Sequence, residues 1–205
     1  TAPIEVTSLN GLDQFYQLQG ITVSGQGSGA KLTGIDAGDS IDYWVNVPQD
    51  GNYAFTLTVT SANGAPKGII YKTEDGKTLR TVDVPNLYSQ TVGIRTVLQL
   101  KAGEQKLRLQ AGSAGYELSG IKIEPYTEVI MDGTGSLKVE AENYYDATPN
   151  GIQSTMTGDV LDFRNVGFTV AGGSMDYMLD ITEAGFYKIV CRYATAEGGV
   201  CTTLS

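Results

Sequence analysis

The stretch AGDSIDYWVNVPQDGNY at positions 37–53 decides the fold, because it returns 134 positions later as AGGSMDYMLDITEAGFY at 171–187. The two copies align without a gap over about 28 residues. Solenoid repeats have periods of about 20 to 50 residues, so a repeat at this distance indicates two copies of one domain. The second copy stops short, since by the same offset the last residue, Ser205, matches Tyr71.

Apolar residues alternate with more polar ones along the first half of this stretch, at Ile41, Tyr43, Val45 and Val47. This period of two predicts a half-buried strand, and the turn-forming residues 48–51 end it. A second strand follows, with Phe55, Leu57 and Val59 on its apolar face. Further strands are expected near 67–72, 79–84, 93–100, 105–110 and 117–124. Short strands with regular turns and no helical stripe predict an all-β fold, a jelly-roll β-sandwich in tandem copies of which the second is incomplete.

Composition agrees with an all-β protein and excludes several functions. The chain has 26 glycines, its charged residues make up only 18%, and its net charge is −9 with no histidine. Nucleic-acid binding needs clustered basic residues, and the 14 lysines and arginines form no such patch. An anionic membrane surface is disfavoured for the same reason, and no apolar run reaches the roughly 18 residues that span a bilayer. The chain starts at Thr1 without a signal peptide, so we expect any export signal to be removed or upstream.

The repeat divides the chain into a first module at 1–125, a linker at 126–136 and the beginning of a second module at 137–205. Roughly the last 50 residues of a complete second sandwich are missing, and half a sandwich leaves its inner face and edges open. We therefore expect the chain to be a fragment of a longer polypeptide. Both cysteines lie in the second copy, where Cys191 takes the core position of Leu57. A buried free thiol and a disulfide to Cys201 are both compatible with this pattern.

The pattern from Gly34 to Tyr53 resembles carbohydrate-binding modules of family 6, and the preceding 28–31 is similar to the related family 35. Residues 102–109 and 115–121 resemble the penultimate hairpin and the last strand of family 6. In the second copy, 139–144 and 165–168 are similar to its opening strand and platform loop. The resemblance implies a non-catalytic, secreted, bacterial module that holds a plant cell-wall polysaccharide, such as xylan or β-glucan, for an attached catalytic domain.

In such modules, the resemblance implies, two aromatic rings in loops at one end grip a sugar while an asparagine from the last strand binds its hydroxyls. The first aromatic position falls on Gly34, the second on Tyr88, and the asparagine position on Glu117. Phe168 keeps the first aromatic in the second copy. The same neighbourhood contains Gln90, in the turn of Tyr88, and Tyr116. Tyr88 is either a binding residue or an incidental surface ring, and Tyr116 either lines the site or belongs to the core.

Trp44, the only tryptophan, shares its strand face with Asp42 and Asn46 rather than with the apolar residues. An outward tryptophan between polar side chains is typical of a flat glycan platform on a sheet. The alternative is that Trp44 packs against the terminal strand or the neighbouring copy.

Glu140 and Glu142 stand two residues apart on an expected strand, so both point to one face and repel unless a cation lies between them. Calcium suits such a pair, and the family resemblance implies a structural calcium. In the first copy Glu5 matches Glu140, whereas Thr7 replaces Glu142. A solvated acidic edge is the alternative.

Catalysis by the chain itself is not expected. Glycosidases need two carboxyl groups about 5–10 Å apart with opposed pKa shifts, and nothing around the neighbouring Asp36, Asp39 and Asp42 implies a deep cleft. Histidine, the commonest acid–base residue, is absent from the sequence. We therefore predict a non-enzymatic polysaccharide-binding module, with a structural spacer or protein-docking sandwich as the alternative. An exposed Tyr88 or Trp44 beside hydrogen-bonding groups favours binding, and burial against a neighbour favours the spacer.

Overall fold

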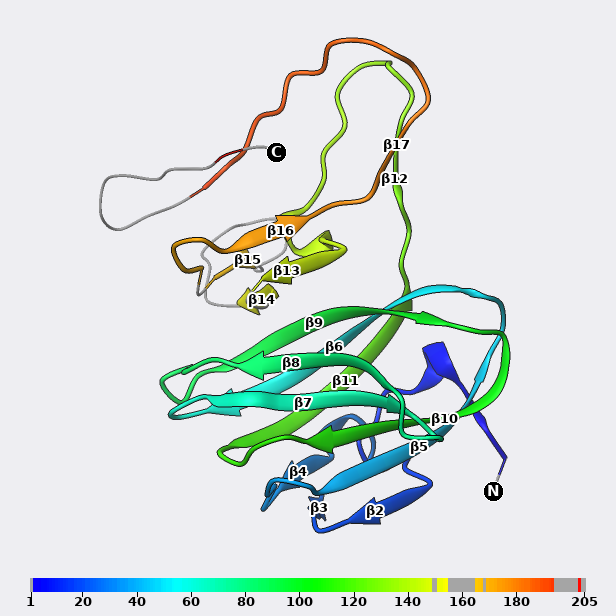
Figure 1. Cartoon of the computed structure of the whole chain (residues 1–205), viewed down its shortest axis with the longest axis vertical. Helices are drawn as coiled ribbons and strands as arrows, with labels where there is room; N and C mark the ends of the chain where they lie inside the picture. Colours follow the sequence, from blue (N-terminus) through cyan, green and yellow to red (C-terminus); the bar gives the residue numbers. More distant parts are fainter. Residues whose placement is uncertain (1, 149–150, 155–164, 168, 194–202, 204–205) are drawn as a thin grey trace.

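The structure, a computed structural model, describes residues 2–148, 151–154, 165–167, 169–193 and 203. Two β-sheets face each other in the first module, as Figure 1 shows in its lower part. One sheet has the order β1-β5-β10-β7-β8 with β2 beside β5: β1 (Ile4–Glu5), β2 (Gln17–Gln19), β5 (Ser40–Val47), β7 (Ala65–Thr73), β8 (Thr78–Val84) and β10 (Gly103–Ala111). The other has the order β15-β14-β9-β6-β11-β4-β3: β3 (Thr22–Ser24), β4 (Lys31–Thr33), β6 (Gly51–Ser61), β9 (Thr91–Leu100), β11 (Tyr116–Pro125), β14 (Gly151–Ser154) and β15 (Asn165–Val166). The predicted all-β sandwich is confirmed.

Short 3-10 turns and small sheets complete the described chain. The turns are η1 (Val6–Ser8), η2 (Gly27–Gly29) and η3 (Ala141–Asn143). Two further strand pairs lie in the upper part of Figure 1, namely β12 (Val129–Met131) with β17 (Leu179–Ile181), and β13 (Asp146–Thr148) with β16 (Ser174–Asp176). Over the residues described, no helix is long and apolar enough to cross a membrane.

The alternating residues of β5 and β6 form the centre of the core. Tyr43 and Val45 of β5 are buried, as are Phe55 and Leu57 of β6. The rings of Phe55 and Tyr71 meet edge to face with centroids 5.7 Å apart, which joins β6 of one sheet to β7 of the other. The strand alternation thus places one apolar face of each sheet between the layers, as the period of two predicts.

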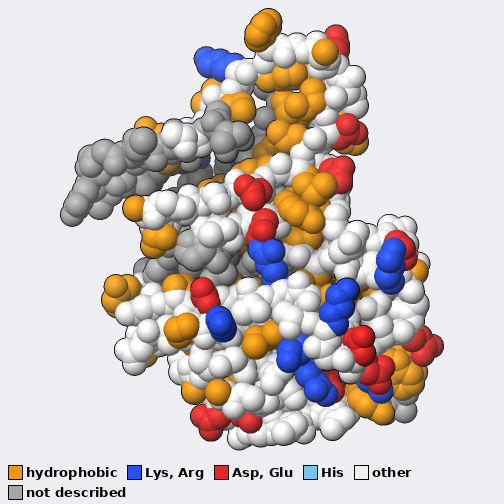
Figure 2. Space-filling model, viewed as in Figure 1, with side chains coloured by type: hydrophobic (Ala, Val, Ile, Leu, Met, Phe, Trp, Pro, Cys, Tyr) orange, Lys and Arg blue, Asp and Glu red, His pale blue; other side chains and the backbone are white. Residues whose placement is uncertain are grey.

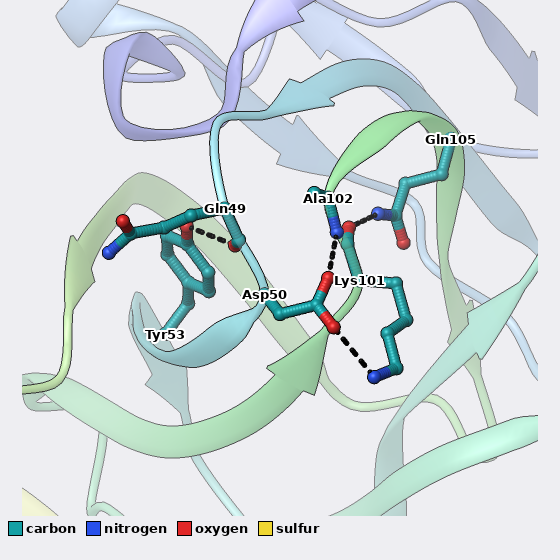
Figure 3. A network of polar contacts seen from close by, with 6 residues as sticks. All are labelled: Gln49, Asp50, Tyr53, Lys101, Ala102 and Gln105. Atoms are coloured by element: carbon teal, nitrogen blue, oxygen red, sulfur yellow. Dashed lines mark hydrogen bonds and ion pairs between the residues drawn. The ribbon is translucent and has the colours of Figure 1, made fainter.

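A polar network holds the turns at one end of the sandwich (Figure 3). The Asp50 carboxylate accepts hydrogen bonds from Lys101 Nζ at 2.7 Å and from the amide of Ala102 at 2.8 Å, and both bonds lower its pKa. Gln105 Nε2 donates to the carbonyl of Lys101 at 2.6 Å, and the Tyr53 hydroxyl donates to the carbonyl of Gln49 at 2.9 Å. Strand β6 starts at this end of the sandwich and ends at Ser61, so Ser61 and the loops around it lie at the opposite end.

The second copy repeats local details of the first. The Tyr187 hydroxyl donates to the carbonyl of Glu183, as Tyr53 does to Gln49. Gly172 and Gly38, at equivalent turns, both have positive φ, of 79° and 96°. Strand β13 pairs antiparallel with β16 as β2 does with β5. These parallels support the repeat locally, while the boundaries at 125 and 136 remain a prediction; β12 lies inside the expected linker.

Several apolar residues of the second copy are exposed where their first-copy counterparts are buried. Met175 is 38% exposed and Leu179 is 42% exposed, whereas the equivalent Ile41 and Val45 are buried. Cys191 is likewise an exposed free thiol, so the predicted burial is wrong. Leu57 is buried between two sheets, and the described part of the second copy supplies no second sheet over Cys191. Cys201 lies outside the described residues.

The second copy contacts the first along β9. Gly151 and Gln153 of β14 pair with Arg95 and Gly93, so the sheet continues across the module boundary. The Arg95 guanidinium lies 5.6 Å from the ring centroid of Tyr144 and 5.8 Å from that of Tyr126. An ion pair between Arg80 and Asp146 adds to this contact.

Candidate functional site

An open cleft of about 460 Å³ lies at the end of the sandwich where β6 ends and β11 begins. Four segments line it: 34–36 after β4, 60–62 at the end of β6, Ser89 in the loop before β9, and 114–117 at the start of β11. Antiparallel pairing of Glu117 with Thr60 sets the two central strands side by side. The fold therefore brings the regions of Gly34, Glu117 and the Tyr88 loop to one place.

Tyr88 lies in a strained loop next to this cleft, and the following residue, Ser89, lines it. Its side chain is 73% exposed, while the preceding Leu87 is buried and anchors the loop. Tyr88 and Ser89 have φ values of 51° and 63°, a left-handed conformation that residues other than glycine adopt at a cost of about 1–3 kcal/mol. Asn86 Oδ1 accepts the Tyr88 amide at 2.9 Å, and the Ser89 amide donates to the Ser61 carbonyl at 2.9 Å. Such strain is held where surrounding contacts require it, often at ligand sites.

Tyr116 and Ser61 form the supporting wall. The Tyr116 hydroxyl donates to the carbonyl of Gly68 at 2.7 Å, and burial raises the pKa of this phenol. The buried Ser61 Oγ donates to the carbonyl of Gly115 at 3.0 Å and accepts the amide of Gly64 at 2.9 Å. Tyr116 thus belongs to the hydrophobic core and is also one of the residues that line the cleft.

Gly34 leaves one wall of the cleft open. Its φ is 63°, and a Cβ at this position would meet only Thr22 Oγ1, at 3.6 Å. Space for a side chain exists, and no ring fills it. The exposed Glu117 carboxylate has no hydrogen bond or ion pair with the residues that the structure describes. Gln90, half-buried, closes the loop by donating its amide to the carbonyl of Leu87 at 2.9 Å.

Sequence comparison supplies the family. The model for the family described as Carbohydrate binding module (family 6) matches residues 13–124, more than half of the chain. The chain belongs to carbohydrate-binding module family 6. The first module is therefore a carbohydrate-binding module, and the open cleft lies at one end of its sandwich. Comparison with curated protein sequences finds no match.

Three solved structures share the fold of the first module. A module of Cellvibrio mixtus lichenase 5A, in complex with cellotriose, is 24% identical with a TM-score of 0.51, over 60% of this chain and 99% of that one. A β-1,3-glucan binding module from Bacillus halodurans is 19% identical with a TM-score of 0.50, over 59% and 98%. An arabinoxylan arabinofuranohydrolase of glycoside hydrolase family 43 from Bacillus subtilis, in complex with cellotetraose, is 18% identical with a TM-score of 0.51, over 61% of this chain and 28% of that one.

Trp44 lies away from the cleft, on the outer face of the first sheet of this family 6 module. Its ring meets that of Tyr16 edge to face at 5.7 Å, and Lys106 Nζ lies 4.8 Å from the Tyr16 centroid. Lys106 also pairs with Glu74 at 2.5 Å. Figure 2 shows orange side chains beside blue and red ones over β5 and β10, at lower right. Trp44 is half-buried against Tyr16, a partner that neither sequence alternative named.

The family 6 resemblance implied calcium, and the structure does not bring the candidate carboxylates Glu5, Glu140 and Glu142 into one group. Glu140 and Glu142 are not on a strand: Glu140 precedes η3 and Glu142 lies inside it, buried. Lys138 Nζ pairs with Glu140 at 2.5 Å, and Asn46 Nδ2 donates to Glu5 Oε2 at 3.1 Å. In the part of the chain described, no three acidic, cysteine or histidine side chains gather into a metal site. Calcium remains a prediction, checked by comparing the unfolding temperature with calcium and with a chelator.

Sequence reasoning missed the part that two residues play at the cleft. Asp36 lines the cleft directly after the Gly34 turn, and Ser61 ties together the three loops around it. The only sequence signal for Ser61 is its place at the end of a long alternating strand, three residues before Gly64. In the structure this glycine has a positive φ. Phe168, the remaining candidate, lies outside the described residues.

Proposed function

We propose that the first module binds a polysaccharide through the cleft beside Tyr88 and thereby holds an attached glycoside hydrolase near its substrate. The observation that carries the proposal is the exposed Tyr88 ring, which a strained loop holds next to Ser89, a residue that lines the cleft. Polysaccharides of plant cell walls lie outside cells, so we propose that the parent polypeptide is a bacterial protein that is secreted or held at the cell surface.

The chemistry of the cleft suits a sugar ring. A pyranose has an apolar face that packs on a flat aromatic ring and hydroxyls around its edge that need polar partners. Tyr88 offers the ring, while Asp36 and Glu117 offer acceptors. A site with a single stacking ring binds weakly. When linked modules bind the same polymer, each raises the effective concentration of the next, and the overall affinity increases. Binding therefore fits a tethering role better than tight capture of a free sugar.

The glycan class is proposed from proteins of the same fold. The modules described above were solved with cellotriose or as a β-1,3-glucan binder, and the Bacillus subtilis structure is an arabinoxylan-cleaving enzyme. This chain matches only 28% of that enzyme, which supports a module attached to a catalytic domain. We accordingly propose a β-glucan or xylan as the polymer.

One observation supports the alternative role of a spacer or protein-docking domain. Strand β14 adds to the edge of β9, and Arg95 lies against Tyr126 and Tyr144. The first module thus has a surface that contacts the second copy. This contact leaves Tyr88 exposed, so docking and glycan binding do not exclude each other.

Tyr88→Ala should abolish retardation of the protein on a gel containing its polysaccharide. Loss of a stacking ring of this size removes about 1.5–3 kcal/mol, which is about a tenfold to hundredfold weaker association. Tyr88→Phe keeps the ring and should retain binding, and because the side chain is exposed neither variant should change the unfolding temperature appreciably.

The polysaccharide panel should contain xylan, β-glucan and mannan. A wild-type protein that migrates unretarded on all of them contradicts these three polysaccharides as its ligand. Trp44→Ala separates the two faces: if it alone removes retardation, the outer face with Tyr16 binds the polymer and the cleft does not.

A further inference from the structure

The cleft beside Tyr88 presents acidic groups and no basic ones. Asp36 and Glu117 are its charged lining residues, and neither lysine nor arginine is among the side chains that line it. Both are exposed, and within the described chain neither carboxylate has a hydrogen bond or an ion pair. A third carboxylate, that of Asp39, accepts the amide of Asp36 at 2.8 Å and contributes to the raised pKa of the Tyr116 phenol.

Three hydroxyl groups of the cleft already form hydrogen bonds within the protein. Thr60 Oγ1 lies 2.7 Å from Thr91 Oγ1, and Ser61 Oγ bonds to Gly115 and Gly64. The Tyr116 hydroxyl donates to Gly68. The Ser89 hydroxyl and the two carboxylates remain for a ligand. Ionised carboxylates accept hydrogen bonds and donate none, so the cleft requires a ligand rich in donors.

Positive charge on the ligand satisfies this requirement best. A bond from an ammonium to a carboxylate is shorter and about twice as strong as a bond between neutral groups. Uronic acid or sulfate groups would meet like charges, and the net charge of −9 adds to that repulsion. The open wall at Gly34 leaves room for a substituted sugar ring.

We propose that this cleft prefers a glycan whose sugar rings carry free amino groups, with Glu117 as the residue that binds the ammonium. The inference rests on the proposed function, since it names the sugar class for the same cleft. Tyr88 stacks on the ring, and Glu117, opposite Thr60 in the strand pair, accepts from the ammonium group.

Calorimetric titration with two short oligosaccharides tests the preference. At about pH 6 and physiological salt, the wild-type chain should bind a glucosamine hexamer about two- to fivefold more tightly than its N-acetylated counterpart, the range that an ion pair to one exposed carboxylate supplies. Glu117→Gln should reduce that ratio to nearly one while leaving the affinity for the N-acetylated oligomer within about twofold. Glu104→Gln, which removes an equal charge from an exposed position at the start of β10, should leave the ratio unchanged.

Each outcome decides the question. Equal affinity for both hexamers, or a preference that survives Glu117→Gln, overturns the amino-sugar inference. If neutral β-glucan or xylan oligosaccharides bind in the same experiment with loss in Tyr88→Ala, the proposed function still stands. If no glycan of any class binds, both the function and the inference are wrong. If Glu104→Gln lowers the ratio of the two affinities as much as Glu117→Gln does, the ligand is attracted by the overall charge of the protein, and the inference is also overturned.

Discussion

Raising the pH from 10 to 11 should lower the free energy of unfolding of the first module by about 3 kcal/mol, because three tyrosines buried in its core keep protons that the unfolded chain releases. Tyr43, Tyr71 and Tyr116 lie in the core of the first module, and burial raises the pKa of each phenol above its ordinary value near 10. The stability associated with these phenols is fully present below pH 10 and is lost as the pH rises above it. Each contributes about 1 kcal/mol over this interval, from the 1.4 kcal/mol that corresponds to one pKa unit.

Urea unfolding at pH 9, 10, 10.5 and 11, followed by circular dichroism, measures the effect. Phenolate absorbance should rise together with unfolding rather than before it. Tyr71→Phe is the control, since it removes one of the three phenols and should reduce the loss by about a third. Free energies that stay constant to pH 11 would contradict the assignment of these phenols to the core. Lys106, whose pKa is raised by its bond to Glu74, acts in the same direction.

The strands could be predicted because their signal is local. Ile41 to Val47 alternate in and out, and the observed β5 at Ser40–Val47 follows that pattern closely. The predicted strand through Glu140 and Glu142 is wrong, since η3 forms there instead. Two glutamates spaced by two residues are compatible with a strand and with one tight turn, and only contacts with the rest of the fold decide between them.

The candidate site was predictable in position and not in detail. Tyr88 and Glu117 could be placed at one end because the turns of a sandwich gather at its ends. The role of Ser61 depends on the simultaneous approach of Gly64 and Gly115, which lie far apart in sequence. The packing of Trp44 likewise depends on its ring contact with Tyr16. The Tyr16 amide donates a hydrogen bond to the Asp42 carbonyl at 2.7 Å, which brings the two rings together. Long-range contacts of this kind carry no local sequence signal.

Asp42 of the repeated motif shows how such a contact can bury a residue that the sequence pattern predicts to be exposed. The alternation places it on the outer face of β5, as a polar residue beside Trp44. It is nevertheless only 6% exposed, because Arg108 of β10 lies directly opposite and covers it. Arg108 Nε and Nη2 donate to the two carboxylate oxygens at 2.7 and 2.8 Å. A paired geometry of this kind is stronger than a single contact, and lysine cannot reproduce it.

Arg108→Ala should lower the free energy of unfolding by about 2–3 kcal/mol, because it leaves the Asp42 carboxylate buried without its partner. Removing one member of a fully buried pair costs about 3–5 kcal/mol, and the smaller figure allows for the 39% exposure of the Arg108 side chain. Arg108→Lys should lose about half as much, since one donor replaces the fork. Urea unfolding at neutral pH gives these values, and a double-mutant cycle with Asp42→Asn separates the pair from its surroundings. The double variant should be more stable than the sum of the two single losses implies, because the uncompensated charge is gone. Strictly additive losses would mean that the pair contributes nothing to stability and that Asp42 is kept in the motif for another reason.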